Sequence, residues 1–536
     1  MSKKDDDTCS QHEKGKCAHA EGYHTHADSK ASHAEGKYTR ALARGAHSEG
    51  SHTHSRGYAS HSEGSHTRAR GNASHAEGHY TEAVGNDSHA EGKKTIASGE
   101  ASHVEGEGTN DIAALIDSIV PGKSVDIGVS GAQSTEASGE ASHAEGSGTQ
   151  ATGDYSHAEG VATLASGAAS HAEGLGSQAI GIASHAEGDP TIAEGDFSHA
   201  EGTSTYAVGY ASHSEGATGA AIGVASHSEG SNNIAYGDFS HAEGASGTAV
   251  GFASHSEGKV GLAIGCASHA EGFISIAYGD VSHSAGFITG AFGFGAHADG
   301  NVTLAYGMSS HTEGFYNLAY GDYSHVEGTD NAAVGDGSHA EGGGTSALGQ
   351  ASHSGGVDAV ALQNAQWARS SGWFGDKLAQ TSEYYVRGHS DAGATGWLCL
   401  TFDDSHSPEA VATPGNIVNQ PNQNQIPYIH PDSMLTEKVQ IIGAHYPSII
   451  SPNVEHFSLE GSKCIENNGV TLAALPGGSY TTIISDTFTF SPQAQPYLDQ
   501  PNNLHTVAVL IPAGVTGPTR WYATIKASHV AWNNVM

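Results

Sequence analysis

The chain has 536 residues, and its acidic residues outnumber Lys and Arg by 36 when histidine is counted as neutral. This charge disfavours binding to nucleic acid through phosphate contacts, and no apolar stretch approaches the length of a membrane span. The five cysteines are scattered, and their odd number argues against a complete disulfide framework. We therefore expect no nucleic-acid binding, no membrane insertion and free thiols.

Residues 1–16 are charged, irregular and too short to fold alone. They lack the apolar core of a secretory signal, so we expect no signal peptide. We interpret this segment as an attachment peptide or a disordered tip.

Through residues 17–356 a histidine recurs every fourteen residues, from His19 to His103 and again from His143 to His353. It lies almost always in the pentapeptide Ser-His-Ala-Glu-Gly. Self-similarity at such a fixed period is typical of a solenoid, in which each coil pairs with its neighbours. The period therefore predicts one coil of two short strands and two turns for every fourteen residues.

The residue types within one repeat predict how a coil is built. Each half is expected to be a five-residue strand closed by a glycine, as in Ser156–Gly160 and Thr163–Gly167. Side chains alternate faces along a strand, so the Ser or Thr that opens each half and the Ala two residues later should fill a narrow interior. The glycines recur every seven residues, where a sharp turn needs positive φ or close backbone approach.

Residues 110–134 interrupt the repeats between Thr109 and Thr135, which occupy the same register. Apolar residues at helical spacing, from Ile112 to Ile119, precede Pro121-Gly122. We expect a short helix and loop extruded from the roll, with the coils on either side still stacked. The insertion is either a surface decoration or a knob where three chains meet or a partner docks.

The outward side chains of the later repeats predict self-association. An interior of Ala, Ser and Thr buries too little apolar area to offset the ordering of fourteen residues per coil. Apolar residues recur at one outward register, and a long apolar stripe on a thin rod is typical of a chain interface. They are Ile264, Tyr278, Phe292, Tyr306, Tyr320 and Leu348. We predict a homotrimer.

From Val357 the period stops, and a separate domain is predicted over residues 357–536. A short helix near 359–368 should precede short strands separated by Pro, Gly and Asn turns, which is the spacing of a β-sandwich. The expected strands are Gly396–Phe402, Tyr480–Ser485, Thr487–Phe490, Thr506–Ile511 and Trp521–Lys526. The predicted fold class is thus all-β: a trimeric parallel β-roll or solenoid of 14-residue repeats, followed by a C-terminal β-sandwich-like domain.

Two candidate sites lie in the repeats. His24, His26, His52 and His54 form two His-Thr-His pairs, which we expect to share a strand face, so that three chains would offer six nitrogens to a transition metal on the trimer axis. The His-Ala-Glu motif predicts parallel columns of imidazole and carboxylate at about 4.8 Å spacing. Glu is expected to pair with protonated His or with turn amides, and the first pairing would hold a bundle together in mild acid.

The C-terminal domain offers binding residues rather than a recognisable catalytic set. The aromatic residues Trp367, Trp373, Tyr384 and Tyr385 would suit stacking on sugars, or would belong to the core. Polar residues suited to hydrolysis occur without nucleophile or metal spacing. They are His389, Asp391, Asp403, Asp404, Ser405, His406, His430 and His456. We predict no catalytic residue and no cofactor.

The halves Ser-x-Ala-x-Gly and Thr-x-Ala-x-Gly resemble the head repeats of trimeric autotransporter adhesins of the YadA type, over residues 17–356. The resemblance implies a trimeric left-handed parallel β-roll. Similar repeats occur in bacteriophage tail fibres and appendage proteins. Because a signal segment and an anchor segment are not recognisable, we favour a virion location over a bacterial surface.

The predicted function is therefore a non-enzymatic, homotrimeric virion fibre. Its N-terminus would contact other virion or baseplate proteins, and its C-terminal domain would bind a glycan or protein of the host surface. The alternatives are a fibre with an autoproteolytic C-terminal chaperone domain, and an adhesin or filament subunit of a cell or spore surface.

Overall fold

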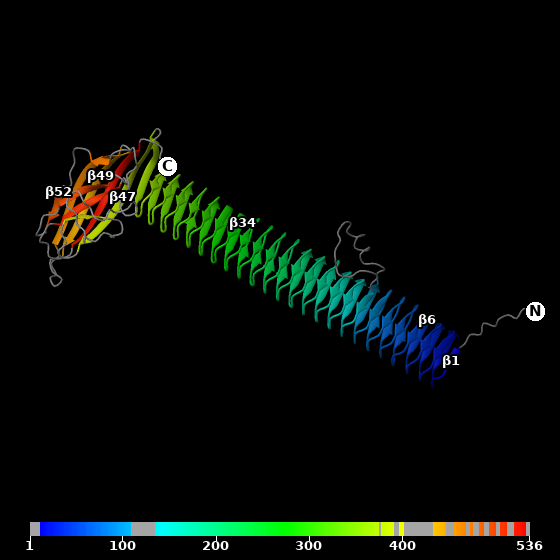
Figure 1. The fold of residues 1–536 in the computed structure, drawn as a ribbon. Coiled ribbons are helices and arrows are strands. Elements are labelled where there is room, and N and C mark those ends of the chain that lie inside the picture. Colours follow the sequence, from blue (N-terminus) through cyan, green and yellow to red (C-terminus); the bar gives the residue numbers. More distant parts are fainter. Residues whose placement is uncertain are drawn as a thin grey trace, which may run out of the picture. The chain divides into compact units, whose positions relative to one another are not determined.

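The computed structural model describes residues 11–108, 134–374, 377–390 and 396–400, together with the strands between 433 and 531. All regular elements of these residues are β-strands (Figure 1), which confirms the all-β fold class. The chain divides into two compact units, Met1–Ala267 and Ser268–Met536. The helix predicted within 110–134 lies outside the described residues, apart from Ser134. No helix of the described residues has the length and hydropathy needed to cross a membrane.

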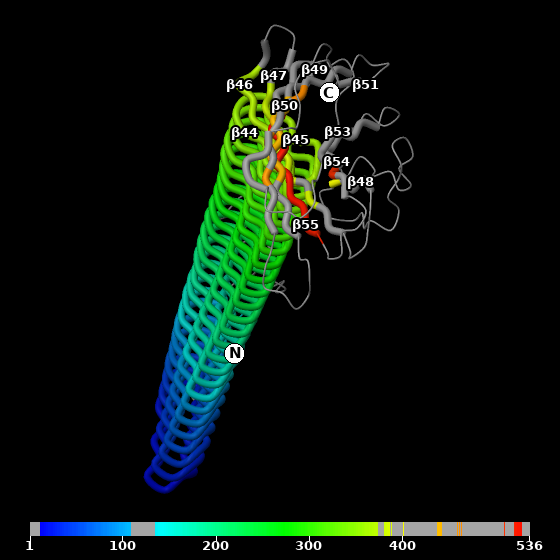
Figure 2. The backbone as a smooth tube through the Cα atoms, turned by 90° about the vertical axis from the view of Figure 1, so that its left-hand side faces the viewer, coloured from blue at the N-terminus to red at the C-terminus, as the bar shows by residue number. Residues whose placement is uncertain are grey.

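The first unit is a parallel β-solenoid whose successive turns lie on one another (Figure 2). Each strand pairs in parallel with the strand two elements later, fourteen residues along the chain, so β2 (His19–Tyr23) pairs with β4 (His33–Lys37). The stacking begins earlier than predicted, because β1 (Gln11–Glu13) pairs with β3 (Thr25–Ala27). Residues 11–16 thus belong to the coils, and the interpretation of the whole segment 1–16 as irregular is wrong.

The two halves of a coil differ more than the sequence suggested. The first half forms a strand that begins at the histidine, as in β18 (His157–Val161), whereas the second half forms only two residues of strand, as in β19 (Leu164–Ala165). In each half a residue with left-handed backbone, Ala162 (φ 56°) or Ala169 (φ 57°), directly precedes the next inward hydroxyl residue. The prediction of two five-residue strands is therefore wrong for the second half of this coil, whose strand is shorter.

The interior of the coil is the one predicted. Ala158 and Ala165 are fully buried, and Ser156 and Thr163 are 1% exposed. In this coil both buried hydroxyls bind backbone: Ser156 Oγ donates to the Gly153 carbonyl at 2.6 Å, and Thr163 Oγ1 donates to the Glu159 carbonyl at 3.1 Å. Where such bonds form, they favour hydroxyl residues over further alanines at the inward positions.

The two glycines of a repeat serve the two purposes expected of them. Gly160 has φ +102°, a backbone conformation that residues other than glycine rarely adopt. Gly167 has no such φ, but a Cβ atom there would lie 1.8 Å from the carbonyl oxygen of Gly181 in the next coil. The first glycine provides the backbone conformation and the second provides the close approach.

The coils on either side of the 109–133 segment stack directly, as predicted. Thr95 pairs with Thr135, and His103 pairs with His143, in the same parallel register as elsewhere in this unit. The insertion therefore interrupts the sequence repeat but not the hydrogen-bonded columns.

The second unit begins with coils of the same kind, and these include one turn beyond Val357. In place of the helix predicted near 359–368, β45 (Val360–Ala361) pairs with β43 (Ser346–Ala347), and β46 (Trp367–Phe374) pairs with β44 (His353–Val357). The helix prediction is therefore wrong. The coil pattern was missed here because Gln366 stands at the position where the preceding coil has the buried Ser352.

Gln366 closes the turn of this last coil. It is only 3% exposed, and its Oε1 accepts a hydrogen bond from the Gln363 amide at 3.0 Å. A side-chain oxygen thus binds the backbone of the turn, as the serine hydroxyl does in other coils, although Gln363 and Gln366 both differ from the repeat.

Two antiparallel sheets follow. The larger continues from β46 in the order β46, β47 (Lys377–Ser390), β55 (Thr519–Ala531), β49 (Ser433–His445) and β50 (Glu455–Asn467). β51 (Leu472–Ala474) and β52 (Thr482–Asp486) pair with β50. The smaller sheet holds β48 (Gly396–Cys399), β54 (Leu504–Ile511) and β53 (Gln493–Asp499).

Four of the five predicted strands correspond to β48, β52, β54 and β55, whereas Thr487–Phe490 lies outside the described residues. The long strands β47, β49 and β50 were not predicted. The described side chains of β47, β49 and β55 alternate between buried and exposed, so that one face of β49 and β55 carries the core residues Val439, Ile441, Trp521 and Ile525. A sandwich packing of the two sheets stays a prediction.

Candidate functional site

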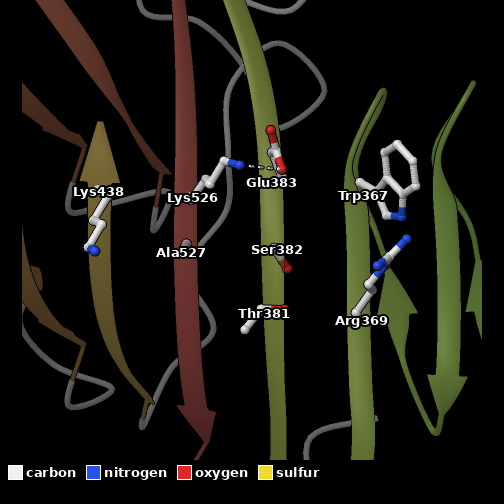
Figure 3. Close-up of a pocket in the computed structure, with 8 residues that line it drawn as sticks. All are labelled: Trp367, Arg369, Thr381, Ser382, Glu383, Lys438, Lys526 and Ala527. Carbon is white, nitrogen blue, oxygen red and sulfur yellow. Dashed lines mark ion pairs between the residues drawn. The ribbon is translucent and has the colours of Figure 1, made fainter. Parts of the chain in front are cut away.

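A pocket of about 540 Å³ lies on the larger C-terminal sheet (Figure 3). This volume falls in the usual range of small-molecule sites. The pocket draws on four neighbouring strands, β46, β47, β55 and β49. Its lining residues are Trp367, Arg369, Thr381, Ser382, Glu383, Lys438, Lys526 and Ala527.

One cross-strand row forms the centre of this pocket. Trp367 pairs with Glu383, Glu383 with Lys526, and Lys526 with Lys438, so four residues from four strands lie side by side. All four are exposed or half-buried. The residues that follow them along each strand face the other way and are buried: Ala368, Tyr384, Ala527 and Val439. Strand alternation thus places the whole row on the open face of the sheet.

The row contains one ion pair and one further cation. Lys526 Nζ lies 3.3 Å from Glu383 Oε2, and the Tyr385 hydroxyl donates to Glu383 Oε1 at 2.8 Å. That hydrogen bond, with burial and the carboxylate charge, raises the pKa of Tyr385 to about 12. Lys438 is the cross-strand partner of Lys526, and its side chain points away from the Glu383–Lys526 ion pair (Figure 3).

Trp367 is held at the edge of the pocket by its neighbours. Its ring stacks on His353 at 4.8 Å with an interplanar angle of 19°, because it occupies the histidine register of the coils. The Arg369 guanidinium lies 5.1 Å from the ring centroid, and the residue remains 39% exposed. The Trp367 ring, held in place by His353 and Arg369, therefore lies at one end of this row.

Of the four aromatic residues predicted for sugar stacking, the structure places only Trp367 in the pocket. Tyr384 is 3% exposed and accepts a hydrogen bond from Gln366 Nε2, and burial raises its pKa. Tyr385 contacts Glu383 and lies 6.0 Å from the Tyr522 ring. The side chain of Trp373 is outside the described residues.

Sequence reasoning missed Arg369, Glu383, Lys438 and Lys526. Each of the four is on a different strand, and β49 and β55 are far from β46 and β47 in the chain. The residues considered for hydrolysis lie outside the described residues or have side chains that the structure does not describe. They are His389, Asp391, Asp403, Asp404, Ser405, His406, His430 and His456.

The second candidate site, the histidine–glutamate ladder, consists of the His and Glu of successive Ser-His-Ala-Glu-Gly motifs. Neighbouring imidazoles stack in parallel, as between His157 and His171, whose centroids are 4.8 Å apart. In most coils the Glu lies beside the His of the same coil, with 3.6 Å between His157 Nε2 and Glu159 Oε2. The predicted columns are confirmed.

The protonation behaviour of the ladder is opposite to the expectation of stabilising His⁺. Half-burial, followed by the neighbouring imidazoles, lowers the pKa of ladder histidines such as His171 and His199. Hydrogen bonding from the next carboxyl group and burial raise the pKa of Glu91 and Glu243 to about 7. Neutral imidazoles therefore dominate this column near pH 7.

The four predicted metal ligands occupy two different registers. His24 and His52 have left-handed φ values of 57° and 60° in the turns, whereas His26 and His54 lie in the strands β3 and β7 (His54–Ser55). The turn breaks the alternation on which a shared strand face depended. His54 lies among arginines, and burial followed by Arg40 lowers its pKa to about 4. Metal binding by these residues on a trimer axis stays a prediction.

Ladder groups such as His47, Glu49 and His61 also bring three ligand atoms within 4.8 Å of one another. Their rings are nearly parallel, with 6° between the planes of His47 and His61. An imidazole lone pair lies in the ring plane, so two stacked rings do not direct their lone pairs at one shared ion. We assign no metal to the ladder.

Comparisons with known proteins assign no family. No protein-family model matches the chain, and no curated protein matches it. Among solved structures, the tailspike protein of Acinetobacter baumannii phage AM24 covers 85% of this chain and 78% of its own, at 8% identity and a TM-score of 0.17. A likeness of this degree carries no argument about function, and the resemblance to YadA-type head repeats stays a prediction.

Proposed function

We propose that the chain is a structural subunit of a homotrimeric virion fibre that presents its C-terminal sheets to a host surface. The observation that carries the proposal is the coil itself: a repeated, hydrogen-bonded spacer with an interior of Ala, Ser and Thr. Such a coil is consistent with a structural fibre, and it gains stability by burying its outward apolar side chains against further copies.

An apolar column, defined as the outward residues at one fourteen-residue register, supports self-association. In the first unit it comprises Val208, Ile222, Tyr236, Val250 and Ile264. In the second unit it comprises Tyr278, Phe292, Tyr306, Tyr320, Val334 and Leu348. Tyr278 is 56% exposed, and the Tyr306 and Tyr320 rings stack at 5.0 Å. A continuous apolar surface of this kind marks an interface.

A longer period supports another copy of the chain as the partner. In the first unit Tyr155, Phe197 and Phe239 recur every 42 residues at one turn register, and each is more than half exposed. The coils between them carry alanine there, as at Ala183. Large and small residues thus alternate with a pitch of three coils, roughly 14 Å. A second copy has the same pitch and would interlock in register.

Charge reversal in the apolar column tests this interface. We expect the double variant Tyr278→Arg, Tyr306→Arg to dissociate the oligomer to single chains, because each arginine would have to be desolvated between copies. The control is Phe315→Arg, which also replaces an exposed aromatic residue but lies in a register occupied elsewhere by Lys37, Lys93 and Lys259. A double variant that sediments like the unaltered protein would contradict the proposed interface.

The location is tested by immuno-electron microscopy with antibodies against the full chain. The proposal predicts labelling of appendages on virus particles; labelling confined to cell or spore surfaces would support an adhesin or filament instead. The intact mass after expression tests the remaining alternative. A chain of 54.7 kDa argues against self-cleavage, whereas release of a C-terminal fragment would establish it.

A further inference from the structure

A cationic surface lies on the N-terminal coils of the first unit. Its centre is formed by Arg40, Arg56 and Arg68, three exposed residues of successive coils that we call the arginine cluster. The chain as a whole has a net charge of −36, and residues 134–366 contain one basic residue, Lys259. A local excess of positive charge in such a chain indicates a surface that meets an anionic group.

The backbone places the arginine cluster at the corners of a small triangle. Arg40, His54 and Arg68 are successive partners in parallel register, so the Cα atoms of Arg40 and Arg68 lie two strand spacings, about 10 Å, apart. Arg56 follows His54 by two residues and faces the same way, because Ser55 between them is buried. Its Cα atom is therefore about 8 Å from those of both other arginines. Burial, followed by Arg40, Arg56 and Arg68, lowers the pKa of His54 to about 4, as expected if the three charges surround it.

Carboxylates neutralise the arginine cluster only at its edge. Among the residues that the structure describes, neither Arg40 nor Arg56 has a carboxylate partner. Glu82 binds mainly Arg70, whose Nε lies 2.8 Å from Glu82 Oε1, whereas Arg68 Nη1 lies 3.8 Å from Oε2. An anion held among the three arginines would offset their mutual repulsion.

The other acidic residues of these coils lie in the other half of each repeat. Between residues 29 and 81 all of them belong to the histidine–glutamate ladder. They are Glu35, Glu49, Glu63 and Glu77. Arg56 also occupies the register that carries Val208 of the apolar column further along the chain, so the apolar surface does not extend to these coils. The arginine cluster is thus a separate surface with unpaired positive charge.

We propose that the arginine cluster binds one dianionic phosphate group, free or carried by a larger molecule. Guanidinium groups are planar forks that match pairs of phosphate oxygens, and three of them from three coils can contact different oxygens of one tetrahedral group. A carboxylate, with one charge and two oxygens, would leave two of the cations unpaired. A nucleic acid is a poorer occupant, because its further phosphates would be repelled by the remainder of this acidic chain. The site needs only one chain, so the inference goes beyond the proposed fibre and does not depend on it.

Isothermal titration of the full chain at pH 8 and constant ionic strength tests the inference with inorganic phosphate, glycerol 3-phosphate and acetate as probes. Phosphate is mostly dianionic at this pH, so we expect one phosphate per chain to bind at least about tenfold more tightly than acetate. Glycerol 3-phosphate that binds as tightly as the free ion shows that a larger molecule can carry the group, whereas weaker binding assigns the site to the free ion. Phosphate that binds no more tightly than acetate, or does not bind, would overturn the proposal.

Two variants locate the site. The double variant Arg40→Gln, Arg56→Gln keeps long polar side chains and should weaken phosphate binding at least about tenfold. Lys30→Gln, which removes an exposed cation of a turn outside the cluster, should leave binding unchanged. A double variant with an unaltered melting temperature and undiminished binding would contradict the assignment.

Sedimentation of the same samples keeps this result apart from the fibre proposal. A trimer that does not bind phosphate refutes only the site, and a single chain that binds phosphate refutes only the trimer. A double variant that dissociates to single chains but still binds phosphate would make the arginine cluster an interface between copies instead.

Discussion

Replacing Gly167 with alanine should lower the free energy of unfolding by at least about 3 kcal/mol. The backbone at Gly167 is open to alanine, but the new Cβ atom would lie 1.8 Å from the Gly181 carbonyl oxygen in the next coil. Relief requires the two coils to separate, which breaks the parallel hydrogen bonds between them. Urea unfolding of the full chain measures the loss, and hydrogen exchange shows whether it is centred on these two coils.

The matched control is Ala168→Ser, one residue along the same turn. Ala168 is exposed, so a small polar side chain there meets solvent and should change stability by less than about 0.5 kcal/mol. If Gly167→Ala behaved like this control, the close stacking of successive turns would be wrong.

Acid should destabilise the folded chain, with the thermal midpoint falling by several degrees between pH 8 and pH 5. Ladder histidines have folded-state pKa values below the ordinary 6.5, because half-burial and neighbouring imidazoles oppose protonation. The group comprises His47, His61, His89, His143, His171, His199, His227, His241, His297, His311 and His339. Their contribution is fully present above pH 6.5 and is lost as the pH falls through the lowered folded-state values.

Ladder glutamates act with the opposite sign. The raised pKa values of Glu63, Glu91, Glu173 and Glu243 give a contribution that is present below pH 4.5 and lost as the pH rises toward 7. We expect the histidines to dominate because more of them are shifted and they are more deeply buried. Calorimetry across this range checks the sign.

The pH effect should be traceable to the column. Replacing His171, His199 and His227 together with glutamine removes three of its titrating groups and should flatten the profile. A midpoint that stays constant or rises on acidification of the unaltered protein would contradict this account.

The sequence predicted the coils well because each one depends on contacts fourteen residues apart. The buried Ala158 and Ala165, the hydroxyl residues and the two kinds of glycine follow from alternation and from the needs of a tight turn. The prediction failed at the last coil because Gln366 replaces serine and Trp367 replaces histidine. Different residues there satisfy the same backbone groups and the same stacking, which a pattern of identities does not detect.

The pocket was beyond local sequence reasoning for another reason. Trp367 was recognised as a candidate, but its partners Glu383, Lys438 and Lys526 reach it only through antiparallel pairing of distant strands. Spacing along the chain does not indicate which residues of distant strands pair. In the coils, by contrast, the fourteen-residue spacing itself determines which residues pair.

The mass of the full chain in solution tests the central claim most directly, since thin coils with an alanine interior are proposed to be stable only when bundled. Sedimentation equilibrium at micromolar concentration should give three times the chain mass of 54.7 kDa. A stably folded species of 54.7 kDa at the same concentration would contradict the account.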